Sequence, residues 1–427
     1  MFDVIVIGGG FAGVTAAREL SLRGRSVLLL EGRDRLGGRT WTARWGEDQI
    51  EYGGGWVHWH QPHTWSEITR AGLTVELSDP PQVASWFVGE QRRSGTASER
   101  DAIAGRGWDR FVDGVHESLP SPHFPRQAIG ALARMDGLTI RQRLDELGLS
   151  AEEYDVLAAE LESVAHGPLD EAGAVSILRW HALSGYSLEL TQYTGGRVTL
   201  TTGTRGLLDA IAGQGRQETR LSTPVAAVRG TADGVEVETR DGELMEARTA
   251  VVAVPLNALP GIEFEPGLSE GKREAIALGQ ASRGVKIFIR AAGERVNQNV
   301  IKPGHEFGYL DTEIMAEDGT QVLIGFGLDG EAIDPADLPA VQRALDVILP
   351  GYQALEATAH DWLGDEFSRG TWAIHRPGWY THHHAEMRRP EGRVVLAGSD
   401  IANGWAGFID GAIESGLWAG AVADGLI

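Results

Sequence analysis

The strongest constraint on the fold lies near the start of the sequence, where a glycine-rich turn joins a strand to a helix. An apolar run over 4–7 leads into the turn 8–13, and a helical pattern follows over 14–22. A second apolar run over 26–30 ends at Glu31. Short apolar runs of this kind are typical of buried parallel strands. The segment therefore predicts the βαβ unit of a Rossmann-type α/β fold.

The glycines of this turn, Gly8, Gly10 and Gly13, form the pattern GxGxxG of dinucleotide-binding sites. They permit a tight turn, close approach of the backbone to a pyrophosphate, and tight packing of helix on strand. The helix N-terminus offers free N–H groups to the phosphates. Glu31 is placed to accept hydrogen bonds from a ribose 2′-OH, and its charge would repel the 2′-phosphate of NADP. These residues alone leave NAD and FAD open.

A second glycine pair favours FAD. Gly37 and Gly38 precede Arg39, whose forked guanidinium could reach back to the pyrophosphate. NAD dehydrogenases generally lack this second element. The structural alternative is a surface arginine beside a glycine turn.

Further nucleotide-domain segments follow later in the chain. Strand patterns over 225–228, 235–239 and 247–254 are separated by Asp-Gly pairs, which predicts a three-stranded meander. Near the end, a strand over 394–397 and a Gly-rich turn lead to a helix over 408–426. We therefore predict a discontinuous FAD-binding domain over 1–78, 196–265 and 390–427, and a substrate-binding domain over 79–195 and 266–389.

The inserted segments predict an α+β substrate-binding domain. Residues 100–190 look mainly helical, and Ser150 and Glu153 form a capping box for a helix that stops near Gly167. Residues 284–330 look rich in strands, and 285–289 is the clearest of them.

Composition excludes several classes of protein. Lysine and arginine number 38 against 60 acidic residues, a net charge of −22, which argues against nucleic-acid binding. The acidity mildly favours a cationic substrate, or serves only solubility. The chain has no cysteine, so disulfides, thiolate metal sites and a thioether-linked flavin are excluded. No apolar run approaches the roughly 20 residues of a membrane helix. A cytoplasmic protein with no membrane partner is expected.

The sequence resembles the flavin monoamine oxidase family in motifs distributed over the whole chain. Within that family, residues 400–405 (DIANGW) most resemble the bacterial nicotine and hydroxynicotine oxidases. The matching motifs are 8–13 (GGGFAG), 36–40 (LGGRT), 51–56 (EYGGGW), 251–255 (VVAVP), 284–287 (GVKI), 396–400 (LAGSD) and 407–412 (GFIDGA).

The resemblance implies non-covalent FAD, because Thr371 stands where some relatives carry the cysteine that tethers the flavin. It also implies that the backbone of Val225 pairs with the adenine and that Gly54 and Gly55 pass close to the isoalloxazine. The helix that begins near Phe408 would direct its N-terminus at the flavin and stabilise its reduced anion. The implied cofactor-binding residues are Gly8, Gly10, Gly13, Glu31, Gly38, Arg39, Gly54, Gly55, Trp56, Val225, Gly398, Ser399, Asp400, Gly407 and Phe408.

Three residues carry the implied chemistry. Lys286 occupies the position of a lysine that holds a water at flavin N5, and Trp372 and Phe408 match two aromatic rings that flank the substrate amine. Phe408 replaces the tyrosine common there and makes the site more apolar. The alternatives are a lysine on the wet face of a strand and a tryptophan that belongs to the core.

Trp56 and His166 are expected to line the substrate cavity. Hydroxynicotine oxidases are expected to carry a polar amide near the His166 position, so the histidine argues against that substrate. The run His382, His383 and His384 has metal-ligating side chains. We interpret it as an exposed loop, because nothing nearby completes a coordination sphere, and we predict no metal.

The expected function is an FAD-dependent amine oxidase that moves hydride from the α-carbon of a neutral primary or secondary amine to flavin N5. The resulting imine hydrolyses, and dioxygen or an electron-transfer protein reoxidises the flavin. The alternatives are a flavin dehydrogenase, an L-amino-acid oxidase with Arg283 or Arg179 as a carboxylate clamp, and a non-catalytic FAD-binding protein. A homodimer is also expected.

Overall fold

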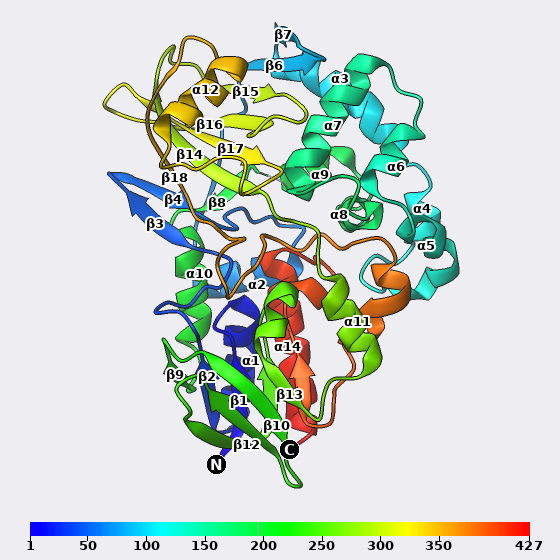
Figure 1. The fold of residues 1–427 in the computed structure, drawn as a ribbon, viewed down its shortest axis with the longest axis vertical. Coiled ribbons are helices and arrows are strands. Elements are labelled where there is room, and N and C mark those ends of the chain that lie inside the picture. Colours follow the sequence, from blue (N-terminus) through cyan, green and yellow to red (C-terminus); the bar gives the residue numbers. More distant parts are fainter. Residues whose placement is uncertain (195) are drawn as a thin grey trace.

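The computed structural model describes residues 1–194 and 196–427. Figure 1 shows a sheet in the lower part of the molecule, near both chain ends, and a second sheet with a group of helices above it. The strand order in the lower sheet is β13-β10-β11-β12-β1-β2-β9, and β19 also pairs with β12. Its strands are β1 (Phe2–Ile7), β2 (Val27–Leu30), β9 (Glu218–Arg220), β10 (Val225–Gly230), β11 (Val235–Thr239), β12 (Leu244–Val252), β13 (Glu263–Glu265) and β19 (Val394–Leu396).

The βαβ unit predicted from the sequence is confirmed. β1 pairs in parallel with β2 and with β12, and the side chains of Ile5 and Val6 are fully buried. The connecting helix α1 (Phe11–Leu22) begins three residues before the predicted Val14. Glycine is a poor helix former, which hid the fact that the last glycine of the turn lies inside the first helical turn.

The remaining strands of the lower sheet come from distant parts of the sequence. β10, β11 and β12 form the predicted antiparallel meander, and β19 joins β12 in parallel. The C-terminal helix α14 (Ile409–Gly425) packs on α1, where a Cβ on Gly416 would lie 2.4 Å from the carbonyl oxygen of Ala12. The end of the chain thus completes the layer that its start begins.

The upper sheet has the strand order β18-β14-β17-β16-β15-β6-β7. β14 lies between β17 and β18, and its side chains from Val285 to Ile289 are all buried. The strands are β6 (Val83–Val88), β7 (Gln91–Gly95), β14 (Val285–Ala292), β15 (Gln298–Ile301), β16 (Tyr309–Met315), β17 (Gln321–Gly327) and β18 (Gln353–Ala359). Two short ladders pair β3 (Thr42–Trp45) with β4 (Asp48–Glu51) and β5 (Val75–Leu77) with β8 (Val198–Leu200).

Helices cover one end of the upper sheet, and α1 and α14 pack on the lower sheet (Figure 1). The predicted capping box opens α7, with the Ser150 hydroxyl accepting the Glu153 N–H, and α7 ends at Ala165. The other helices are α2 (Pro62–Ala71), α3 (Ala97–Phe111), α4 (Val115–Ser118), α5 (Ile129–Asp136), α6 (Ile140–Asp145), α8 (Ala174–Leu183), α9 (Leu188–Thr194), α10 (Gly203–Ala212), α11 (Glu270–Leu278), α12 (Leu338–Ile348) and α13 (His384–Met387).

The predicted division into two domains stays a prediction. The strands of the lower sheet fall in 1–78, 196–265 and 390–427, and those of the upper sheet fall in 79–194 and 266–389. Residue 195, the predicted end of one segment, lies outside the described residues. Within the described ranges, no helix combines the length and the apolar character that crossing a membrane requires.

Candidate active site

A cavity of about 1440 Å³ runs between the two sheets and brings the predicted site residues together. All of them border it except Gly13. The volume exceeds the roughly 300–1,000 Å³ of an ordinary small-molecule pocket, so a cofactor and a substrate both have room.

The glycines of the βαβ turn divide into two kinds. A Cβ on Gly13 would lie 1.9 Å from the carbonyl oxygen of Gly8, so this glycine permits the packing of α1 against the turn. At Gly10 the nearest atom to a Cβ would be the Cα of Gly38, at 3.8 Å. Gly10 caps α1, and no side chain caps the helix N–H groups. Space and free donors therefore coincide at Gly10, as a pyrophosphate requires.

The two predicted isoalloxazine glycines also differ. Gly54 is exposed to the cavity, and a Cβ there would come no closer than 3.6 Å to Thr40. Gly55 is buried, and a Cβ there would lie 2.8 Å from the side chain of Glu51. Gly54 leaves room for a ligand, whereas Gly55 serves the packing of its own chain.

Glu31 is held rigidly at the end of β2. Its carboxylate accepts the Gly9 N–H at 2.6 Å and the Arg33 N–H at 2.8 Å. Each oxygen keeps a lone pair for a further donor. A ribose hydroxyl is such a donor, and Val225 borders the same cavity from β10.

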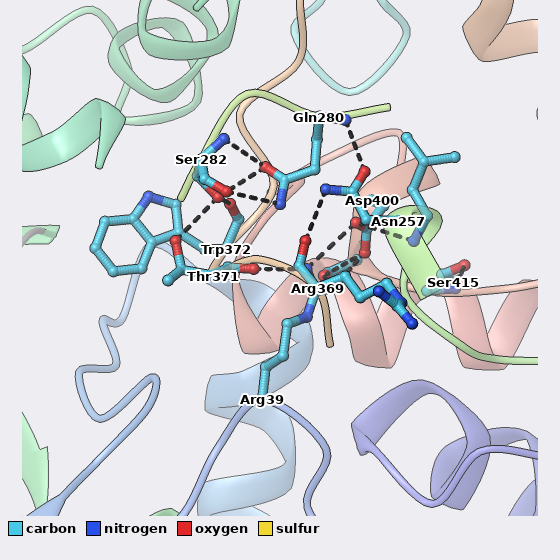
Figure 2. Close-up of polar contacts among 12 residues, drawn as sticks. Arg39, Asn257, Gln280, Ser282, Arg369, Thr371, Trp372, Asp400 and Ser415 are labelled. Atoms are coloured by element: carbon cyan, nitrogen blue, oxygen red, sulfur yellow. Dashed lines mark hydrogen bonds and ion pairs between the residues drawn. The ribbon is translucent and has the colours of Figure 1, made fainter. Parts of the chain in front are cut away.

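Arg39 ties the start of the chain to its end (Figure 2). Its guanidinium forms an ion pair with Asp400 and donates to the Ser399 hydroxyl at 3.0 Å and to the Thr371 carbonyl at 2.8 Å. Burial would raise the pKa of Asp400, but the adjacent Arg39 outweighs it and keeps this pKa below its usual value. The pair fixes the turn that begins at Gly398.

The N-terminus of α14 also faces the cavity. Gly407, at φ +87°, and Phe408, the cap residue of α14, both border the cavity, and no side chain caps the helix. The carboxylate of Asp410, in the first turn, is turned away, because it accepts the Thr64 N–H at 2.8 Å and lies 3.1 Å from His63 Nδ1. The positive end of the helix is thus left to the cavity.

Lys286 is buried in β14, which excludes the alternative of a lysine on the wet face of a strand. Its Nζ donates to the Gly53 carbonyl at 3.0 Å and lies 4.7 Å from the centre of the Trp56 ring. Burial lowers the pKa of Lys286 to about 8, although the carboxylates of Glu313 and Glu51 oppose this shift. The ammonium is therefore still mostly protonated at neutral pH, but it loses its proton more readily than an exposed lysine does.

Trp372 and Phe408 border the cavity from different segments. The Trp372 indole N–H donates to the Val164 carbonyl at 3.0 Å, and its ring stacks on His166 at 4.2 Å. Phe408 meets Trp180 edge to face at 4.9 Å. His166 has no exposed surface, so it lies behind Trp372 at the edge of the cavity.

Among the aromatic residues of the cavity that sequence reasoning missed, two lie on the same sheet as Lys286. Tyr309 and Phe326 both border it, and the register places Lys286 opposite Phe326 and Phe326 opposite Tyr309 on three adjacent strands. Cross-strand neighbours share one face of a sheet. Only the register of the strands places these residues beside Lys286, and a single sequence does not reveal that register.

The interpretation of the histidine run as an exposed loop was wrong. His382 and His383 lie in the π-helical turn Trp379–His383, and His384 begins α13 with its ring buried against Tyr380. The buried rings of Trp379 and Tyr380 pack beside these histidines, a contact that the run of three histidines did not indicate. Over residues 1–194 and 196–427, no group of His, Cys, Asp or Glu side chains is arranged to hold a metal ion.

These features fit FAD. The uncapped N-termini of α1 and α14, the free space at Gly10 and Gly54, and the fixed Glu31 carboxylate lie along one cavity. Among the predicted residues, Gly10, Glu31 and Gly54 are placed where they would hold the cofactor, whereas Gly13 and Gly55 serve the packing of the chain. With no cysteine in the chain, no thiol is available to tether it.

Comparison with known proteins agrees. The family model for flavin containing amine oxidoreductases matches residues 11–422. The chain is 39% identical to the pseudooxynicotine dehydrogenase of a Pseudomonas species, over 98% of this chain and 85% of the relative. It is 30% identical to the (S)-6-hydroxynicotine oxidase of Paenarthrobacter nicotinovorans, over 97% of each. The structure of a putrescine oxidase bound to putrescine superimposes with a TM-score of 0.84, at 21% identity and 99% coverage of each chain.

The structural neighbour confirms the predicted fold, an α/β FAD-binding architecture of the monoamine oxidase type. The family match extends over nearly the whole chain. This chain therefore belongs to the flavin-containing amine oxidoreductase family and is an FAD-dependent enzyme.

Proposed function

We propose that the enzyme oxidises a neutral primary or secondary amine related to nicotine, held between Trp372 and Phe408. FAD, when bound, supplies the acceptor, N5, for a hydride from the α-carbon of the amine. The observation that carries the proposal is the convergence of Trp372, Phe408 and buried Lys286 on the cavity that fits the cofactor. The names of the two relatives support the substrate class.

In this proposal the side chains position the amine and exclude water. The indole and phenyl rings present apolar faces that orient the nitrogen, a role worth roughly tenfold or more in rate. Lys286 donates one N–H to the Gly53 carbonyl, which leaves two donors for a water beside the flavin position. Loss of hydride from the α-carbon leaves an iminium ion, which becomes the neutral imine by releasing its N–H proton to water. Hydrolysis then gives a carbonyl compound and either ammonia, from a primary amine, or a smaller amine, from a secondary one.

The acceptor that completes the cycle is proposed to be dioxygen, which would take two electrons and two protons and leave as hydrogen peroxide. A dehydrogenase that passes electrons to another protein is the second candidate, and the name of the 39% identical relative favours it. The cytoplasmic location and the homodimer stay predictions.

The L-amino-acid oxidase alternative lacks support from the arginines that the sequence offered for it. Neither Arg283 nor Arg179 borders the cavity. Arg283 pairs with Glu171 at 3.8 Å, and Arg179 donates to the Tyr380 hydroxyl and to the carbonyl oxygen of Gly404. A substrate carboxylate would find no clamp at either residue.

The test is anaerobic mixing of the flavin-loaded enzyme with nicotine-like amines, aryl-alkyl amines, polyamines and amino acids, followed by air. Bleaching of the flavin by one class of amine and recovery with peroxide is the expected outcome. Slow recovery in air would favour the dehydrogenase. A flavin that stays oxidised with every amine would contradict the proposed function and favour the non-catalytic alternative.

A further inference from the structure

His166 occupies an unusual position at the end of α7. Its backbone is left-handed, with φ +51°, in a region that residues other than glycine seldom adopt. Its side chain is fully buried, and both ring nitrogens have partners. Because the Val285 carbonyl can only accept, Nε2 carries the proton and donates to it at 2.8 Å. Nδ1 then accepts from the Thr371 hydroxyl at 2.9 Å.

One side of His166 holds the backbone that leads to Lys286. The His166 carbonyl accepts the N–H of Arg283 at 2.9 Å and that of Gly284 at 2.8 Å, and the ring holds Val285. A Cβ on Gly284 would lie 2.5 Å from the ring carbon Cδ2, so the imidazole rests directly on this backbone. Three consecutive residues before Lys286 are therefore bonded to one histidine.

The other side of His166 holds Trp372. The two rings are nearly parallel, with an interplanar angle of 6° and a centroid distance of 4.2 Å. The Thr371 hydroxyl also donates to Ser282 Oγ at 2.9 Å, so its one proton is shared between Ser282 and Nδ1. Ser282 in turn donates to the Trp372 carbonyl at 2.5 Å (Figure 2). The plane of the indole is thus fixed from one side by the fully buried ring of His166.

We propose that His166 is a positioning residue that sets the orientation of Trp372 relative to Lys286, and that it acts as a neutral, Nε2-protonated ring without touching the substrate. The inference rests on the proposed function, since it assigns these two side chains to the same reaction. Burial lowers the pKa of His166 to about 4, and the nearby Lys286 charge adds to this effect, while the bond to Val285 opposes it. The ring therefore stays neutral through the physiological range.

The test compares two variants that separate the stack from the hydrogen bonds. His166→Phe keeps a flat ring against Trp372 and loses both bonds, whereas His166→Gln keeps a donor near the Val285 carbonyl and loses the stack. His305→Phe is the matched control, because His305 is also buried against an aromatic ring, Phe307, but does not border the cavity.

The measurement is the anaerobic rate of flavin reduction at increasing amine concentration, with FAD content and melting temperature determined in parallel. Both His166 variants should bind FAD and lose about tenfold or more in the limiting rate, while the apparent amine affinity changes less than about threefold. The control should match wild type. Limiting rates within about twofold of wild type for both variants would overturn the inference. A rate lost only in proportion to lost FAD would also overturn it.

A second measurement does not depend on amine oxidation. Nitrogen NMR of labelled histidines in the flavin-loaded enzyme, with His166 assigned by its absence from the variants among the thirteen histidines, should show a neutral Nε2–H ring at about pH 7. A protonated ring or the Nδ1–H tautomer would overturn the inference. If no amine reduces the wild-type flavin, the proposed function fails, and this spectrum still tests the state of His166.

Discussion

The cofactor half and the substrate half of the cavity are built by different means. The cofactor half consists largely of backbone: glycines, helix N-termini, and the Glu31 carboxylate bonded to backbone N–H groups. The substrate half consists of side chains, such as Lys286 and Trp372, whose orientation depends on residues far away in sequence. In the cofactor half, a substitution is therefore expected to act by filling space that the backbone or the cofactor needs. In the substrate half, it is expected to act by changing how the side chains that face the amine are oriented.

The largest effect is expected at Gly13, where the backbone itself is in the way. Gly13→Ala would place a methyl group 1.9 Å from the Gly8 carbonyl, so α1 must move away from the turn. We expect a loss of about 4 kcal/mol or more, a large part of the roughly 5–15 kcal/mol that stabilises a typical domain. Soluble yield and thermal melting measure it. Gly130→Ala in α5, where a Cβ would meet nothing within 4 Å, is the control and should melt at or slightly above the wild-type temperature. A wild-type melting temperature for Gly13→Ala would contradict the distinction.

Gly10→Ala tests the other kind of glycine in the same turn. Its φ of −77° suits any residue and its Cβ would be 3.8 Å from the nearest atom, so the apoprotein should melt as wild type does. The methyl group would stand where the pyrophosphate is expected. We expect FAD to bind about a hundredfold more weakly, or about 2.7 kcal/mol. Titration of apoprotein with FAD by fluorescence measures this, and an unchanged dissociation constant would show that the cofactor does not approach Gly10.

Lys286→Met tests a side chain in the substrate half of the cavity. FAD should remain bound, because the cofactor contacts are elsewhere, while turnover falls by about tenfold or more through the loss of a positioned donor. Stopped-flow measurement separates flavin reduction from reoxidation. Unchanged rates for both half-reactions would remove the lysine from the mechanism.

Trp372→Ala should lower kcat/KM for the preferred amine by about tenfold, since it removes one wall that orients the nitrogen. Trp372→Phe, which keeps an aromatic face, should recover part of the loss. Steady-state kinetics across both variants provide the measurement. A near-wild-type kcat/KM for Trp372→Ala would exclude an orienting role.

The smallest effect concerns stability and its dependence on pH. The folded protein lowers the Lys286 pKa from 10.5 to about 8, so the unfolded chain holds this proton more tightly. The resulting destabilisation is complete below about pH 8 and fades as pH rises towards 10.5. Lys286→Met removes this destabilisation but also loses the hydrogen bond to Gly53. The net increase in the free energy of unfolding should be about 1 kcal/mol near pH 7. The melting temperatures of the variant and the wild type should converge as the pH rises above 8. If the stability advantage of the variant grew with pH instead, the pKa of Lys286 would not be lowered in the folded protein.

The same contrast explains what the sequence could and could not predict. The βαβ unit, the meander and the FAD motifs are local patterns, and the structure brings Gly10, Glu31 and Arg39 to one cavity as expected. His166 borders the cavity, but its stack on Trp372 could not be read from the sequence, because this contact depends on how α7 ends beside β14. Tyr309 and Phe326 depend on strand register in the same way.

The packing of α14 on α1 has a consequence for biosynthesis. The cofactor half of the cavity needs both the turn at Gly10 and the turn from Gly398 to Phe408. In the sequence, all strands of the upper sheet lie between these two turns. A ribosome-bound chain thus carries β12 without its partner β19, and α1 without the helix that covers it, until the residues of β19 and α14 have been made. Capture of the flavin therefore has to wait until the turn from Gly398 to Phe408 has been made, and it reports that these two distant segments have come together.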